Sequence, residues 1–284
     1  MSNNQKTSHR SAGASVTHST HHHARPSVAV HKFSSCDGCQ LAFLNMGESL
    51  LTLSELVDIR HFAEAGPVDT ESKVDIAFVE GSISTPDDLD RIRKIRDNSN
   101  YLVTMGACAT AGGIQALRNF VDADTWVNAI YASPEYIHTL DKSTPIKDHV
   151  KVDFELWGCP VNKRQIVTTI RALLFYVTPV EIHEKVCMEC KRLQATCVMV
   201  TKGEPCMGPV TRTGCGALCP RFGRACYACY GPGDSINTSA LSRRFSGLGL
   251  PDELAAQRFL FINSNAEAFT AAGQKLTSGN ENDA

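Results

Sequence analysis

The sequence predicts an α/β protein, in which a doubly wound parallel sheet is followed by a small, irregular domain rich in cysteine. Two observations lead to this fold class. From Ser27 to about Pro179, short apolar runs alternate with segments of helical periodicity, which is typical of a parallel sheet covered by helices. From Cys187 to Cys229, eight cysteines are interspersed with glycine and proline, which leaves little room for regular structure or for a core of side chains.

Each predicted strand is a short apolar run bounded by polar or turn-forming residues. The strands are expected at Val28–Phe33, Val57–Phe62, Val74–Val79, Tyr101–Met105 and Val152–Leu156. The helices are expected between them, at Gln40–Leu56, Pro86–Arg96 and Val161–Tyr176. Phe43, Met46 and Leu50 share one face of the first helix, as a helix that packs on a sheet requires.

The composition is that of a globular protein, apart from its cysteines. The 284 residues carry a formal net charge of -2, so the sequence predicts no general attraction to nucleic acid or to an anionic membrane. No run of 18 apolar residues occurs, so no membrane-spanning helix is expected. The unusual number is the twelve cysteines, and a function has to account for them.

The two ends of the sequence are polar. Residues 1–26 hold five histidines and show neither an apolar export segment nor a twin-arginine pair, so we expect a disordered tail and a cytoplasmic protein. In that compartment, twelve cysteines favour metal or redox chemistry over disulfides. A short helix is expected at Asp252–Phe261, and the polar stretch Gly273–Ala284 is expected to be frayed.

These features divide the chain into four parts. Residues 1–26 form the tail, 27–180 the sheet domain, 181–235 the cysteine-rich domain and 236–284 a carboxy-terminal extension.

Cysteines follow three of the predicted strands at the point where each strand ends. Cys36 and Cys39 follow the first strand, Cys108 the fourth and Cys159 the fifth. Because the carboxyl ends of parallel strands lie along one edge of a sheet, these four side chains are expected to converge. Four thiolates suit an iron–sulfur cluster or zinc. The alternative is a thioredoxin-like Cys36-x-x-Cys39 pair, with Cys108 and Cys159 as buried thiols.

The carboxy-terminal cysteines account for two further sites of four ligands. They are Cys187, Cys190, Cys197, Cys206, Cys215, Cys219, Cys226 and Cys229. Between Val186 and Tyr230, six Lys and Arg stand against two Glu, which suits the negative charge of two four-iron clusters. Two zinc sites are the alternative, and a disulfide-stapled module is a third. Three sets of four thiols with no evident substrate pocket suggest an electron-transfer chain. No phosphate-binding loop or dinucleotide motif occurs.

Five stretches of the sequence resemble a known family. They are Ser35-Cys36-Asp37-Gly38-Cys39-Gln40, Phe78–Ser82, Gly106-Ala107-Cys108-Ala109-Thr110 with Gly112-Gly113, Gly158-Cys159-Pro160, and the long segment from Cys187 through Lys202–Arg212 to Cys229. Over about Ser27 to Gly231, the chain resembles the small (delta) subunits of the cytoplasmic, NAD(P)-linked nickel–iron hydrogenases and sulfhydrogenases.

The resemblance implies a flavodoxin-like sheet domain and an iron–sulfur domain that together hold three [4Fe-4S] clusters. Cys36, Cys39, Cys108 and Cys159 would hold the proximal cluster. Cys215, Cys219, Cys226 and Cys229 would hold the medial cluster, and Cys187, Cys190, Cys197 and Cys206 the distal one. The Ni-Fe centre would lie in a large partner subunit, and flavin and NAD(P) in further partner subunits. The chain itself would carry no catalytic residue.

Three positions depart from exported relatives of this family. Cys187 stands where those proteins often have a histidine ligand, and Cys219 stands near a position that is often proline. Both differences imply all-cysteine four-iron centres. Ser35 replaces a glutamate that some relatives have, which argues against proton transfer at that position.

Two other classes of protein remain as alternatives. A subunit related to respiratory complex I would share the sheet domain, but its cluster site uses adjacent cysteines, unlike the spaced Cys36 and Cys39. A zinc-organised binding protein would need no redox role.

Overall fold

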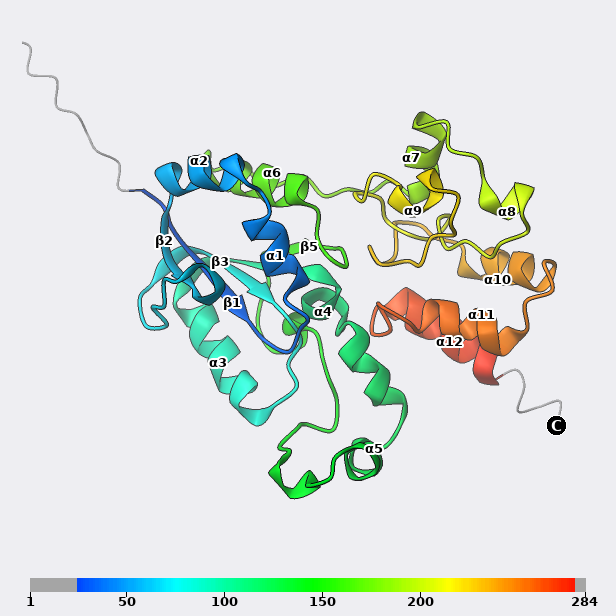
Figure 1. The fold of residues 1–284 in the computed structure, drawn as a ribbon, viewed down its shortest axis with the longest axis horizontal. Coiled ribbons are helices and arrows are strands. Elements are labelled where there is room, and N and C mark those ends of the chain that lie inside the picture. The colour runs from blue at the N-terminus through cyan, green and yellow to red at the C-terminus, as the bar shows by residue number, and fades with distance from the viewer. Residues whose placement is uncertain (1–24, 279–284) are drawn as a thin grey trace, which may run out of the picture.

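The computed structural model describes residues 25–278. The predicted tail lies almost wholly outside these residues, as do residues 279–284. A five-stranded parallel sheet with strand order β2-β1-β3-β4-β5 forms the amino-terminal part (Figure 1). Its strands are β1 (Ser27–Lys32), β2 (Asp58–Phe62), β3 (Val74–Glu80), β4 (Ser99–Met105) and β5 (Phe154–Leu156). This confirms the predicted fold class and all five strands, to within two residues at nearly every boundary.

Helices cover both faces of the sheet. On one face, α1 (Gly38–Leu44), α2 (Glu48–Leu56) and α6 (Lys163–Leu174) pack over Val30, Phe78 and Val103. On the other face, Ile92 of α3 (Pro86–Asp97) packs with Val79 and Leu102. This arrangement on two faces is the doubly wound architecture that the strand–helix alternation predicts.

The prediction of one helix over Gln40–Leu56 was wrong, because the structure has two helices there, α1 and α2. The chain turns at Gly47, whose φ of 61° lies in the left-handed region that favours glycine. The apolar periodicity continues through Met46, which is buried, so the pattern concealed the break.

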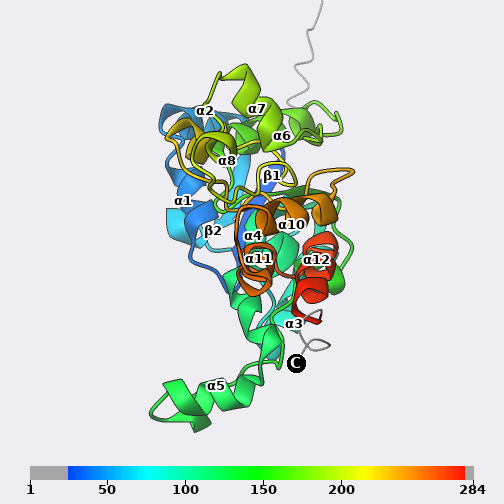
Figure 2. The ribbon, with the colours of Figure 1, turned by 90° about the vertical axis from the view of Figure 1, so that its right-hand side faces the viewer.

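The connection between β4 and β5 is long and partly helical. Its elements are α4 (Gly106–Ala111), η2 (Ile114–Phe120), α5 (Ala123–Ile130), η3 (Pro134–Tyr136) and η4 (Ile146–Asp148), and η1 (Ala63–Ala65) follows β2. Figure 2 shows α5 projecting from the body of the molecule.

The carboxy-terminal half has short helices and irregular loops. Its elements are α7 (Val186–Arg192), α8 (Val198–Thr201), α9 (Leu218–Arg221), α10 (Thr238–Ser246), α11 (Asp252–Phe259) and α12 (Glu267–Ser278). Phe245, Phe259 and Phe269 from the last three helices share one core with Met207 and Val210 of the cysteine-rich segment. The extension therefore packs on this chain's own body and supplies the apolar core that the cysteine-rich segment lacks.

The expectation of fraying from Gly273 onward was wrong as far as Ser278, because these residues belong to α12. Gly273 is buried, and a β-carbon there would lie 2.3 Å from Leu260. In residues 25–278, no helix combines the length and the hydropathy that crossing a membrane requires.

Candidate functional site: three sets of thiols

The first set of cysteines lies at the carboxyl edge of the sheet, as the strand ends predict. Cys36 lies just before α1, Cys39 lies in the first turn of α1, Cys108 lies in α4, and Cys159 follows β5. The Ala107 amide donates a 2.7 Å hydrogen bond to the Gly158 carbonyl, which joins two of the three loops. Burial and, to a smaller extent, the charges of Cys159, Cys36 and Glu80 together raise the pKa of Cys108 to about 12. The four sulfurs are therefore close enough to interact electrostatically.

Glycines make room for these sulfurs. A β-carbon on Gly106 would lie 2.4 Å from the Cys39 sulfur, and one on Gly113 would lie 2.5 Å from the Cys108 sulfur. Both glycines also have positive φ values. Glycine is therefore required at Gly106 and Gly113 for two reasons, the close approach of the backbone to sulfur and the left-handed backbone conformation.

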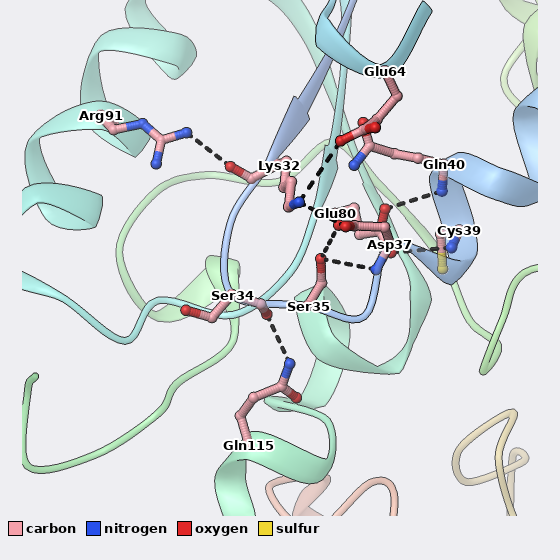
Figure 3. A network of polar contacts seen from close by, with 10 residues as sticks. All are labelled: Lys32, Ser34, Ser35, Asp37, Cys39, Gln40, Glu64, Glu80, Arg91 and Gln115. Carbon is pink, nitrogen blue, oxygen red and sulfur yellow. Dashed lines mark hydrogen bonds and ion pairs between the residues drawn. The ribbon is translucent and has the colours of Figure 1, made fainter. Parts of the chain in front are cut away.

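Glu80 fixes the loop that carries the Cys36-x-x-Cys39 pair (Figure 3). Its side chain is buried at the end of β3, with 2% of the residue exposed. Its two carboxylate oxygens accept hydrogen bonds of 3.0 Å from the backbone amides of Cys39 and Gln40. Burial raises the pKa of Glu80, and the hydrogen bonds from these two amides oppose the rise. Glu80 thus orients the first turn of α1.

Gln115 is a residue of this site that the sequence analysis missed. Its amide donates a 2.9 Å hydrogen bond to the Ser34 carbonyl (Figure 3). Its side-chain oxygen accepts a hydrogen bond from the Cys108 thiol at 3.4 Å. Gln115 therefore joins the loop after β1 to the loop after β4. Its position two residues after Gly113 was the available signal, because the glycine pair already indicated a close approach there.

The second set comprises the first four cysteines of the carboxy-terminal half. Burial raises the pKa of Cys190 to about 11, and the charges of Cys187, Cys206 and Cys197 add to the effect. A β-carbon on Gly208 would lie 3.4 Å from the Cys187 sulfur and 3.5 Å from the Cys206 sulfur. The structure thus brings together the four residues predicted for the distal cluster.

The third set comprises the last four cysteines. Burial raises the pKa of Cys229 to about 12, and Cys215 and Cys219 contribute through their charges. Cys226 is also buried, and Cys229 is among the charges that raise its pKa. The structure thus brings together the four residues predicted for the medial cluster.

The third set lies between the other two. The charge of Cys159, in the first set, contributes to the raised pKa of Cys229, and the charge of Cys206, in the second set, contributes to the raised pKa of Cys226. The spatial order of the three sets is therefore first, third, second.

Backbone amides point at several of the sulfurs. Cys226 N–H donates to the Cys206 sulfur at 3.2 Å, and Ala228 N–H donates to the Cys226 sulfur at 3.4 Å. Amides of Leu218 and Ala217 likewise lower the pKa of Cys215 against the larger effect of burial. Sulfur ligands and N–H donors directed at them fit iron–sulfur clusters, whose potentials respond to such hydrogen bonds. Within residues 25–278, no group of three or more His, Cys, Asp or Glu side chains closes around the position of a single metal ion.

The chain is similar to several known proteins. Residues 36–173 match the family described as NADH ubiquinone oxidoreductase, 20 Kd subunit. The chain is 34% identical over 232 residues to sulfhydrogenase 2 subunit delta of Pyrococcus furiosus, covering 81% of this chain and 96% of that protein. It is 29% identical over 264 residues to one subunit of the F420-non-reducing hydrogenase of Methanocaldococcus jannaschii, covering 80% and 92%. A chain of the NAD+-reducing [NiFe]-hydrogenase in its H2-reduced state aligns with a TM-score of 0.52 and 26% identity, covering 55% of this chain and 95% of that one.

The fold and the thiol sets define an iron–sulfur electron-transfer protein of the α/β class. With these relatives, the chain belongs to the family of small, electron-transferring subunits of hydrogenases. The predicted family membership is confirmed. The chain is thus one subunit of an oxidoreductase of the hydrogenase kind.

Proposed function

We propose that this subunit relays electrons through three [4Fe-4S] clusters, between the Ni-Fe site of a large subunit and a subunit that carries flavin and NAD(P). The observation that carries the proposal is the order of the three thiol sets. The Tyr230 hydroxyl, next to Cys229, donates a 3.3 Å hydrogen bond to the carbonyl of Pro160, next to Cys159, and the Cys226 amide donates one of 3.2 Å to the Cys206 sulfur. The clusters supply one-electron carriers of low potential when bound.

The proposed ligands are three sets of four cysteines. Cys36, Cys39, Cys108 and Cys159 hold the proximal cluster, Cys215, Cys219, Cys226 and Cys229 the medial, and Cys187, Cys190, Cys197 and Cys206 the distal. All twelve are free thiols in the structure. Because burial keeps several of these thiols protonated at neutral pH, metal binding would release protons.

The chain's own residues position the three sites. Glu80 holds the loop of Cys39, the amides of Cys226 and Ala228 point at ligand sulfurs, and the Tyr230 hydroxyl donates to the Pro160 carbonyl between two sites. These contacts fix both the local geometry and the separation of neighbouring sites.

The NAD(P) linkage draws on the NAD+-reducing hydrogenase among the similar structures. The relatives also include F420-non-reducing hydrogenases, so the acceptor needs a direct assay. Hydrogen-dependent reduction of NADP+, NAD+ and a viologen dye by the purified complex would compare the candidates. Reduction of the dye alone would refute the nucleotide linkage.

The test of the clusters is metal and sulfide analysis of the anaerobically purified complex. We expect about twelve iron and twelve acid-labile sulfide per small subunit, with negligible zinc. Replacing one ligand in each set (Cys108→Ser, Cys219→Ser or Cys197→Ser) should change the iron count and the electron paramagnetic resonance signal of one site only. Two or three zinc ions per chain without sulfide would refute the proposal and support a zinc-organised binding protein.

A further inference from the structure

One exposed surface of the cysteine-rich half combines apolar and positive side chains. We define the cationic patch as Val200, Lys202, Arg221, Phe222 and Arg224. Val200 and Phe222 are 77% and 74% exposed, and the three cations are exposed as well. The patch is one surface, because Lys202 Nζ donates a 2.8 Å hydrogen bond to the carbonyl of Gly223, next to Phe222 and Arg224.

The cationic patch adjoins the exposed member of the distal set. Cys197 is exposed and precedes α8, where the Val200 and Thr201 amides both donate to its carbonyl. Val200 thus lies within one helical turn of Cys197. α8 lies on the side of the molecule away from the sheet (Figure 1), so a protein bound there would not cover the strand ends.

The positive charge of this patch is unmatched within the described part of the chain. In residues 25–278, no ion pair joins Lys202, Arg221 or Arg224 to a carboxylate. Glu189 instead accepts hydrogen bonds from the Thr213 hydroxyl and the Ala217 amide, and the half-buried Glu204 forms no ion pair with any of the three cations. A surface that combines exposed aromatic and aliphatic side chains with neighbouring cations is more typical of a protein interface than of a surface that contacts only solvent.

We propose that the cationic patch docks the electron-carrying partner of the distal site, through a face of that partner that is acidic around an apolar centre. The inference rests on the proposed function, because it takes Cys197 as a distal ligand. Charge complementarity of this kind accelerates encounter and selects the partner. Phe222 and Val200 supply the area that is desolvated on contact.

The competing explanation is that these cations only offset the negative charge of this chain's own clusters. The two explanations differ in what charge reversal changes. A docking surface changes association with an acidic protein, whereas internal compensation changes only the potentials of the clusters.

The experiment measures binding of the native complex of this chain with its large subunit, purified without the subunit that carries flavin and NAD(P) so that the patch is accessible, to a small acidic two-[4Fe-4S] ferredoxin used as the probe. Basic cytochrome c is the second probe, and affinities are measured anaerobically by biolayer interferometry at about 20 and about 300 mM salt. The double variant Arg221→Glu/Arg224→Glu is compared with Arg93→Glu/Lys151→Glu, whose side chains are 62% and 85% exposed on the sheet domain. Each substitution changes the charge by -2, so both pairs take the formal net charge from -2 to about -6. Phe222→Ser tests the apolar centre without a change of charge.

We expect the native complex to bind the ferredoxin at low salt and to lose about tenfold or more in affinity at high salt. The patch variant should lose a similar factor at low salt, Phe222→Ser should weaken binding at both salt concentrations, and the sheet-domain variant should bind as the native complex does. Equal ferredoxin affinity for the two double variants, or no binding by the native complex, would overturn the inference. Iron and sulfide analysis of the same samples is independent of binding, so a failure of the cluster proposal would be recognised separately.

Discussion

Replacing Glu80 by glutamine tests whether this carboxylate organises the proximal site. Glutamate and glutamine side chains have nearly the same shape. Glu80 accepts one hydrogen bond from the Cys39 amide and one from the Gln40 amide. Glutamine has a single acceptor oxygen, so its NH2 group would face one of these two backbone N–H groups and leave it without an acceptor. A hydrogen bond to a charged group contributes about 1.5–3 kcal/mol, and a buried donor left unpaired costs a similar amount. Because Glu80 is 2% exposed, water cannot replace the lost acceptor. We therefore expect a loss of about 3 kcal/mol.

The assay is thermal unfolding of the iron-loaded protein, followed by circular dichroism at one scan rate, with the iron content measured beforehand. For a chain of this size, about 3 kcal/mol corresponds to a fall of roughly 6–12 °C in Tm. The proximal site should also lose iron, because the Cys39 amide is no longer held. The matched control is Glu71→Gln, which removes an exposed carboxylate that pairs with Lys94. We expect the control to have no resolvable effect, since exposed pairs contribute little. If Glu80→Gln retained full iron and unfolded at the temperature of the control, the positioning role of Glu80 would be refuted.

Three further predictions concern glycines and buried histidines. Gly106→Ala should remove about four of about twelve iron atoms, because the added β-carbon would lie 2.4 Å from the Cys39 sulfur. Gly47→Ala is the control, since Gly47 also has a positive φ but a β-carbon there would meet nothing within 4 Å. Equal iron content in the two variants would contradict the steric argument. Gly231→Ala should lower Tm and shift Trp157 fluorescence to the red, because a β-carbon would lie 2.2 Å from the buried indole; an unchanged spectrum would show that the ring is not held there. Burial and, to a smaller extent, the charges of the stacked His61 and the nearby Arg91 together lower the pKa of His31 from 6.5 to about 3. Between these two pH values the unfolded state binds one more proton than the folded state. The contribution of the neutral His31 to the free energy of unfolding is therefore complete above pH 6.5 and falls by about 1.4 kcal/mol per pH unit on acidification toward pH 3. In urea unfolding between pH 4 and 7, the free energy of unfolding should depend less steeply on pH in His31→Phe, and an identical pH dependence would exclude His31 as the cause.

Local sequence patterns were sufficient where a feature depends on neighbouring residues. The strands and α3 were predicted nearly to their ends, because apolar runs and helical periodicity are local signals. The convergence of Cys36, Cys108 and Cys159 also followed, since parallel strands place their carboxyl ends along one edge.

What the patterns missed depends on contacts between distant residues. Gln115 joins Ser34 to Cys108, and nothing near Gln115 in the sequence specifies Ser34. Residues 273–278 looked like a polar end, yet Gly273 is buried because its missing side chain lets α12 approach Leu260. In the same way, the sequence showed that the cysteine-rich segment lacks a core but not that α10, α11 and α12 provide one.

The residues next to the cysteines, rather than the cysteines alone, set the separation of the first and third thiol sets. Tyr230 follows Cys229, and its hydroxyl donates at 3.3 Å to the carbonyl of Pro160, which follows Cys159. One residue further along, Gly231 lies against the ring of Trp157, two residues before Cys159. Each contact joins the two halves of the chain, and each contacting residue is at most two positions from a proposed ligand in the sequence. Little flexible backbone therefore separates the contact from the ligand sulfur. The distance that an electron must cross is therefore fixed by the same aromatic contacts that hold the sheet domain to the cysteine-rich half, and a variant that loosens them should slow transfer between these two sites even with all twelve cysteines in place.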